Sequence, residues 1–159
     1  MKATHKPAIP ADLCIPIPDV TDPVMTPAVL LRGAALYLRR HGWTVGEFFA
    51  NSDQNRPFPA ACSLGAINIC AHGRPILCSD DGAQDDDTDA AIIAMRVFAA
   101  SLDPDYGFGS ADYGQGSSSA IDIVSGWNDD PARTLDDVIQ ALTEAADDWD
   151  RTHPAGGAS

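Results

Sequence analysis

The sequence predicts an all-α protein: a compact bundle of four main helices plus one short helix, with an extended Pro-rich N-terminal arm. Apolar residues recur at steps of three and four along several segments, which is the period of an amphipathic helix. Capping residues open these segments, and glycine or proline closes them. An alternation that would suit a strand occurs at 120–125, but no partner strand is found elsewhere, so we expect a helical turn there.

The length of 159 residues fits one domain with a substantial core. We expect the Pro-rich arm at 1–25, the helical domain at 26–150 and a flexible tail at 151–159. The first 27 residues lack the apolar segment of a signal peptide, and no run reaches transmembrane length. These features predict a cytoplasmic protein whose four cysteines are reduced.

The net charge of −13 is the least ordinary property of the sequence. Two Lys and two Glu stand against 21 Asp, and Arg and Ala are favoured, which is partly the codon bias of a GC-rich genome. Such a surface repels nucleic acid and anionic membranes and attracts basic partners. We therefore expect a protein partner with a basic surface, no direct nucleic-acid binding and no membrane binding.

The first helix is expected from Pro27 to His41. Thr26 suits the N-cap, proline suits the first helical position, and Gly42 supplies the stop. A short helix is expected at about 44–50, because Thr44 and Glu47 match a capping box. Its position after the first helix suggests a helix-turn-helix DNA reader, but no basic recognition helix follows.

A third helix is expected over 60–71, where Gly65 is small enough to let another helix approach. Six Asp then lie within 79–89, without the Gly and Glu that a calcium loop requires. We expect a solvated loop whose last Asp or Thr88 caps the next helix at 89–102. The alternative is a weak cation site formed by Asp85, Asp86 and Asp87.

Residues 105–119 are rich in Gly and Ser, with aromatic side chains interleaved at Tyr106, Phe108 and Tyr113. A loop of this length is either mobile or functional. Aromatics between glycines make an adaptable binding surface, or they pin the loop to the core. We take this loop as the best candidate for contact with a ligand or partner.

The strongest helical pattern runs from Leu135 to Trp149, with an apolar stripe on one face and Asp-rich positions on the other. Thr134 is the expected N-cap, and Asp137 makes a weaker form of the capping box. An alternative start places Asp130 at the cap and the following proline at the first helical position.

The segment before this helix holds the second group of candidate binding residues. We expect Trp127 to anchor the turn in the core, and Asn128 and Asp129 to bond nearby backbone N–H groups. Arg133 lies where it can pair with Asp129 or Asp130. These side chains either fasten the helix entrance or form a small polar site beside an aromatic ring.

Several of these segments together look like an uncharacterised family of actinobacteria and their phages, domain of unknown function 6197. The resemblance spans about Thr26 to Ala146 and rests on Leu31–Ala35, His41–Thr44, Cys62–Ile67, Trp127–Asp129, Arg133–Thr134, Asp137–Ile139 and Leu142. It supports the fold and the type of host. The family implies no activity that could be carried over to this chain.

Three functions remain open from the sequence. The first is a protein-binding or regulatory module, because the chain is acidic and carries no phosphate loop, dinucleotide fingerprint or metalloprotease motif. The second is a DNA mimic that inhibits a nucleic-acid-binding protein. The third is a small enzyme with Cys62 as nucleophile, His41 or His72 as base, and Asn128 or Asp129 orienting it. No cofactor is expected, and without a C-x-x-C pair a zinc ribbon is excluded.

Overall fold

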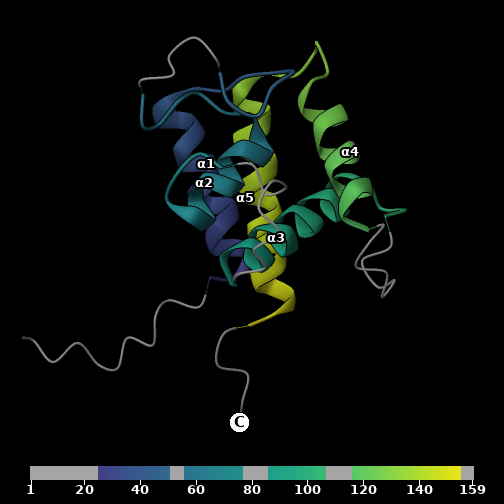
Figure 1. Cartoon of the computed structure of the whole chain (residues 1–159). Coiled ribbons are helices and arrows are strands. Elements are labelled where there is room, and N and C mark those ends of the chain that lie inside the picture. The colour runs from purple at the N-terminus through teal and green to yellow at the C-terminus, as the bar shows by residue number, and fades with distance from the viewer. Residues whose placement is uncertain (1–24, 51–55, 77–85, 107–115, 155–159) are drawn as a thin grey trace, which may run out of the picture.

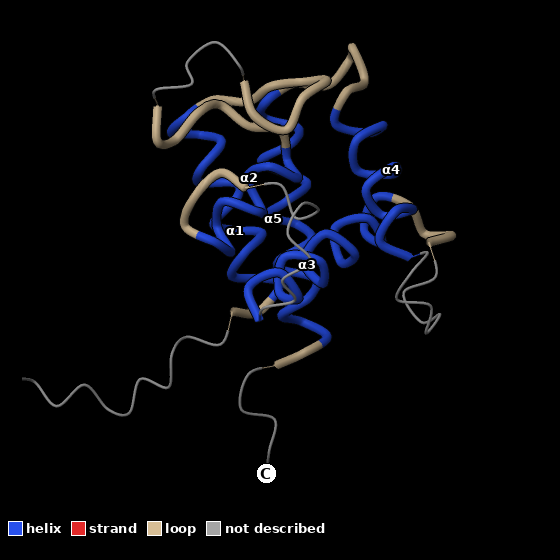
Figure 2. Tube along the Cα trace, in the orientation of Figure 1, coloured by secondary structure: helices blue, strands red, loops and turns tan. Residues whose placement is uncertain are grey.

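The computed structural model describes residues 25–50, 56–76, 86–106 and 116–154, with the side chains of 116–119 left aside. These segments contain five helices: α1 (Pro27–His41), α2 (Ser63–His72), α3 (Asp86–Leu102), α4 (Gly116–Asn128) and α5 (Leu135–Thr152). Figure 2 shows helices and loops in the described segments, where two isolated β-bridges are the sole β-type pairing. The all-α prediction is therefore confirmed. The Pro-rich arm predicted at 1–25 lies almost wholly outside the described residues.

Helices α1 and α5 lie side by side at the centre and run in opposite directions (Figure 1). Arg32, in the first half of α1, joins them by binding Asp147 at 2.6 Å and Asp150 at 2.7 Å near the end of α5. Helix α2 packs on the other side of α1, where Gly33 allows close approach: a Cβ there would lie 3.1 Å from the Cys70 sulfur.

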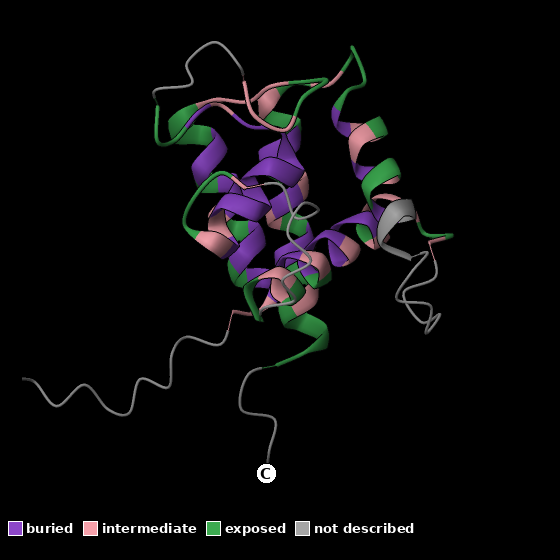
Figure 3. Cartoon of the chain, viewed as in Figure 1, coloured by how far each residue is buried: buried purple, intermediate pink, exposed green. Residues whose placement is uncertain are grey.

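Helix α3 crosses this group, and α4 packs at the edge against α3 (Figure 1). The core runs through all five helices (Figure 3), and its largest fully buried apolar side chains are Phe98, Leu30, Leu31, Leu38, Leu64, Ile67, Leu142, Val124 and Val138. Fully burying such a side chain stabilises the fold by about 1.5–3 kcal/mol. No described helix is long and apolar enough to cross a membrane.

The predicted caps of the two central helices are confirmed. The Thr26 hydroxyl accepts the Val29 N–H at 3.2 Å, and the Thr134 hydroxyl accepts the Asp137 N–H at 3.2 Å. The Asp137 carboxylate accepts the Thr134 N–H at 2.9 Å, which completes the capping box. This backbone hydrogen bond, helped by the Thr134 hydroxyl, lowers the pKa of Asp137. The alternative start at Asp130 is wrong, because α5 begins at Leu135.

The short helix predicted at 44–50 is wrong. Residues 42–50 instead wrap around 60–62, and Trp43 and Phe49 each form a β-bridge with Ala61. Their backbone groups bond across this contact, for example from Thr44 N–H to Ala61 C=O at 3.0 Å. Thr44 and Glu47 match a helix-capping pattern, but the backbone hydrogen bonds between 42–50 and 60–62 replace the helix that this pattern predicts.

Four other boundaries differ from the predictions. Helix α2 begins at Ser63, three residues after the predicted start at 60, and Cys62 is its N-cap. Helix α3 begins at Asp86, so Thr88 and Asp89 lie in its first turn and do not cap it. The helical turn expected at 120–125 is a full helix, α4, which extends into the predicted loop as far back as Gly116 and forward to Asn128. Helix α5 continues to Thr152, two residues into the predicted tail.

Candidate functional site

Asn128, at the end of α4, is the buried centre of a group of hydrogen bonds that reaches out to the surface. We call this group the polar junction, and its members are Trp43, Thr44, Gly46, Ser63, Asn128 and Asp129. Asn128 is 1% exposed. Its Oδ1 accepts the Trp43 indole N–H at 2.9 Å and the Ser63 backbone N–H at 3.1 Å. Its Nδ2 donates to the Thr44 carbonyl at 3.3 Å and to Asp129 Oδ1 at 2.8 Å. The side-chain amide thus uses all four of its bonding positions.

Asp129 extends the junction to the loop after α1. Its Oδ1 also accepts the Gly46 N–H at 2.9 Å, and Gly46 has a φ of +76°, which favours glycine. The prediction that Asn128 and Asp129 bond nearby backbone is therefore wrong. Their backbone partners lie 65 to 84 residues earlier, in the 43–46 segment and at the first residue of α2.

Cys62 is the N-cap of α2, where its sulfur accepts the Gly65 N–H at 3.4 Å. The thiol is buried, and burial raises its pKa, with a smaller contribution from the negative charge of Asp129. A nucleophilic cysteine needs the opposite shift, towards the thiolate. The cap also depends on Gly65, because a Cβ at that position would collide with the Phe48 carbonyl oxygen. Gly65 was predicted to let another helix approach, but the segment that lies against it is the loop at Phe48 and Phe49.

Neither candidate histidine makes a hydrogen bond or ring contact with the Cys62 thiol in the described residues. His72 ends the helix that Cys62 begins, so at 1.5 Å per residue the two are about 15 Å apart along the axis. The His41 ring is directed towards Tyr37 and Phe58, with ring centroids 4.6 and 5.5 Å away. A base must come within about 3 Å of its proton. The geometry gives Cys62 the role of a helix cap.

Trp127 and Arg133 form the outer part of the same corner. Trp127 is half-buried and meets the Phe98 ring edge-on at 5.8 Å. The Arg133 guanidinium lies 4.0 Å from the centre of the indole, and its Nε donates to the Trp127 carbonyl at 3.2 Å. Arg133 also approaches Asp130 at 3.9 Å, which is one of the two predicted pairings. The structure therefore brings Trp127, Asn128, Asp129 and Arg133 together, as a corner that fastens three segments.

The other predicted site residues are more dispersed. Tyr106 is half-buried against the core, while Phe108 and Tyr113 lie outside the described residues. Asp86 and Asp87 are exposed in the first turn of α3, and Asp85 lies outside the description. In the described segments, no three His, Cys, Asp or Glu side chains cluster closely enough to hold a metal ion.

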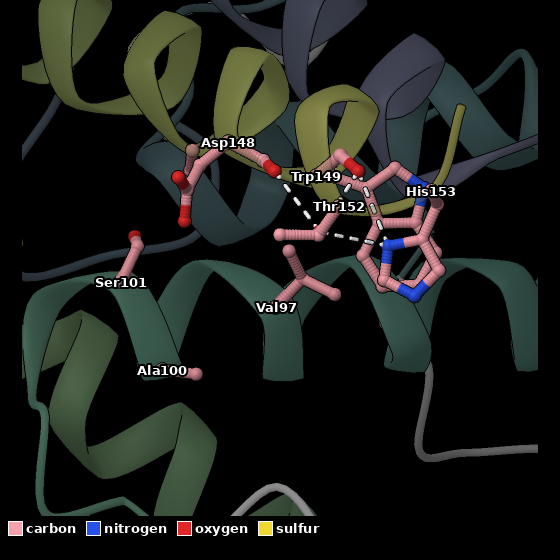
Figure 4. A pocket seen from close by; sticks show the side chains of 8 residues that line it. Val97, Ala100, Ser101, Asp148, Trp149, Thr152 and His153 are labelled. Carbon is pink, nitrogen blue, oxygen red and sulfur yellow. Dashed lines mark hydrogen bonds between the residues drawn. The ribbon is translucent and has the colours of Figure 1, made fainter.

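The structure adds a groove between α3 and α5 that the sequence did not indicate. It consists of two adjoining hollows of about 260 and 520 Å³, which share Ala100, Ser101, Ala145 and Asp148. Figure 4 shows the smaller hollow, with Ser101 on α3 and Asp148 on α5 on its two sides. Trp149 and His153 close one end, their rings stacked at 3.7 Å. The small residues that open this groove look like ordinary core positions in the sequence.

Carboxylates cover the outer side of α5 next to this groove. We call this surface the acidic face of α5, and it comprises Asp136, Asp137, Glu144, Asp147, Asp148 and Asp150, all exposed. Asp147 and Asp150 bind Arg32, which raises the pKa of that guanidinium chiefly through the hydrogen bond that it donates to Asp147. Asp148 pairs with Arg151 at 2.7 Å. These pairs offset the cost of carboxylates at the negative end of the helix dipole.

Comparison with known proteins identifies a family. The model described as "Family of unknown function (DUF6197)" matches residues 22–148. No curated protein and no solved structure matches the chain. Three segments that carry the resemblance in sequence, 41–44, 62–67 and 127–129, meet at the polar junction. The chain belongs to the family of unknown function DUF6197.

Proposed function

We propose that this protein is a binding module that recognises another protein with a basic surface, through the acidic face of α5. The observation that carries the proposal is the separation of α5 into two sides. One side buries Val138, Ile139, Leu142, Ala145 and Ala146, and the other presents the carboxylates to solvent. Because the buried stripe and the capping box fix the helix, the charges are held on a rigid support.

Charge of this kind acts mainly on the rate and selectivity of association. Complementary potentials steer a basic partner towards the acidic face and repel acidic competitors. Salt weakens such an interaction, because at moderate ionic strength exposed charges are screened beyond roughly 10 Å. The proposal therefore implies a complex that forms readily at low salt and dissociates at high salt.

A protein partner fits this face better than imitation of DNA does. The six carboxylates occupy residues 136–150 of α5, about 21 Å of helix at 1.5 Å per residue, or one charge per about 3.5 Å. Duplex DNA carries one charge per about 1.7 Å. The last three of the six, Asp147, Asp148 and Asp150, are already paired within the chain.

The test is affinity capture of the tagged protein from a lysate of its own host, at low and high salt, with the bound proteins identified by mass spectrometry. The acid-face variant carries Asp136→Asn, Glu144→Gln and Asp148→Asn, which spares the partners of Arg32 and the cap at Asp137. The control variant removes three other exposed carboxylates through the substitutions Asp86→Asn, Asp87→Asn and Asp122→Asn.

We expect the wild type and the control variant to retain one basic protein in stoichiometric amount at low salt. The acid-face variant should lose it, and so should the wild type at high salt. Recovery of the protein alone under both conditions would contradict the proposal, and so would equal retention by both variants. A nucleic-acid enzyme as the retained partner would favour mimicry instead.

A further inference from the structure

Building on the proposed function, we infer that the groove between α3 and α5 is the seat of a basic segment of the partner, with an arginine or lysine side chain inserted between the two helices. The acidic face alone would give attraction without a defined position. The groove supplies that position, because Glu144 and Asp148 belong both to the acidic face and to the groove lining.

The floor of the groove suits the apolar stem of a long basic side chain. Ala100, Ala141 and Ala145 are the small residues that leave the space open between α3 and α5. Lys and Arg lay their methylene chains on apolar surface of this kind and keep the charged head at a polar rim. Trp149 and His153 close one end of the groove, and Pro104 bounds it near the other.

The rim of the groove suits the charged head. The carboxylates of Glu144 and Asp148 stand on α5, and Ser101 faces Asp148 from α3 (Figure 4). A guanidinium can donate two parallel hydrogen bonds to a carboxylate. Arg151 already donates one hydrogen bond to Asp148 at 2.7 Å, but both side chains are mostly exposed, at 72% and 63%. Exposed pairs of this kind are weak, so an incoming cation can displace Arg151.

The shape of the groove favours a protein segment over a small molecule. Sites for small ligands usually enclose about 70–90% of the ligand surface. This groove is open to solvent along its outer side and follows α3 from Val97 to its end at Leu102, about 7.5 Å at 1.5 Å per residue, before it reaches Pro104. A segment laid along it keeps one side in contact with the rest of its own protein.

The experiment is an NMR titration of the isotope-labelled full chain with a synthetic arginine–alanine peptide, and with the same peptide carrying glutamine for arginine. We expect shifts of the backbone amides of Ala100, Ser101, Ala145 and Thr152 with the arginine peptide only. The acid-face variant should bind about tenfold more weakly, because two charged contacts are lost. Arg151→Ala should bind about threefold more tightly, because a competing cation is removed.

The substitution Ser101→Trp tests the contribution of the groove without changing the charge of the acidic face. It fills the groove, leaves every carboxylate in place, and replaces an exposed residue whose hydroxyl donates to Phe98 of its own helix. Ile121→Trp, at an exposed position on α4, is the matched control. The inference predicts that Ser101→Trp abolishes the shifts and that Ile121→Trp keeps them, with both variants melting like the wild type.

Other outcomes decide between the two proposals. If the acid-face variant binds the arginine peptide weakly and Ser101→Trp binds it as the wild type does, the groove is not the binding site. The proposed function of the acidic face would still stand. Equal binding of the glutamine peptide would refute both, because charge would then play no part. If sedimentation showed that the free chain is a dimer and that Ser101→Trp makes it a monomer, the occupant would be a second copy and the inference would be wrong.

Discussion

At the residue scale, Asn128 accounts for more of the local order than any neighbour in the Trp-Asn-Asp segment. Its amide satisfies the indole N–H of Trp43 and the first N–H of α2 at once. Buried polar groups that lose their partners cost about 1–3 kcal/mol each. Asparagine is well suited to this position, because the site requires two acceptor and two donor contacts from one side chain.

Replacing Asn128 by alanine tests this role. We expect Asn128→Ala to lower the free energy of unfolding by about 2–4 kcal/mol, since the buried Ser63 N–H and the part-buried Trp43 indole N–H lose their acceptor. Urea unfolding followed by circular dichroism measures the change. Asp122→Asn, an exposed change on the same helix, is the control and should stay within about 0.5 kcal/mol of the wild type. If Asn128→Ala lowers the free energy of unfolding by less than about 0.5 kcal/mol, the polar junction contributes little to stability.

Cys70 provides a second test at this scale, through pH. Burial between α1 and α2 raises the pKa of its thiol from 9.0 to about 11. The stability contributed by the neutral thiol is complete below pH 9 and is lost as the pH rises towards 11, because only the unfolded chain releases the proton in that window. The wild type should lose about 2 kcal/mol more than Cys70→Ala between these limits. Parallel pH profiles of the two proteins would contradict the burial of Cys70.

At the scale of elements, the approach of the 43–50 loop to α2 depends on Gly65. A Cβ there would meet the Phe48 carbonyl oxygen and lie 3.1 Å from the Phe49 ring. Gly65→Ala should therefore destabilise the fold by about 1–3 kcal/mol, as overpacking does. Gly126, inside α4, has open space around it, so Gly126→Ala should stabilise by about 0.5–1 kcal/mol. Thermal melting of both variants gives the comparison, and an unchanged melting temperature in Gly65→Ala would refute the close contact.

Elements whose signals are local were predictable from the sequence. Thr26 and Thr134 cap the helices that they were expected to cap, because the donors lie three residues away. The 43–50 segment was not predictable in this way. Its backbone partners lie at 60–62, and Trp43 bonds a side chain 85 residues later, so the pairing depends on tertiary structure.

The same distinction explains the candidate site. The sequence singled out Trp127, Asn128, Asp129 and Arg133, and the structure gathers them at one corner. Their role differs from the predicted turn, because the binding partners of Asn128 were invisible in the sequence. The groove was missed for a related reason: it arises from how α3 and α5 cross, and alanines at its floor carry no signal of their own.

At the scale of the whole molecule, the polar junction and the acidic face lie on different parts of the described structure. The polar junction fastens α2, α4 and the 43–50 loop at one corner. The acidic face lies on α5, whose buried side anchors it to α1, and the groove lies between α3 and α5. This arrangement separates the polar junction, which stabilises the fold, from Asp136, Glu144 and Asp148, which we propose for binding. Substitutions at these three residues spare the partners of Arg32 and the cap at Asp137, so they should change affinity while leaving the melting temperature nearly unchanged.

The most direct measurement of the central claim is the dissociation constant of the captured partner, determined by calorimetry for three proteins at low salt. The account predicts about tenfold weaker binding by the acid-face variant, because charged contacts at the interface are lost, and wild-type affinity for the control variant. Both variants lose three negative charges, so a difference in affinity between them reports where the carboxylates lie and not how many are removed. Equal affinities of the two variants would contradict the claim that the acidic face of α5 is the binding surface.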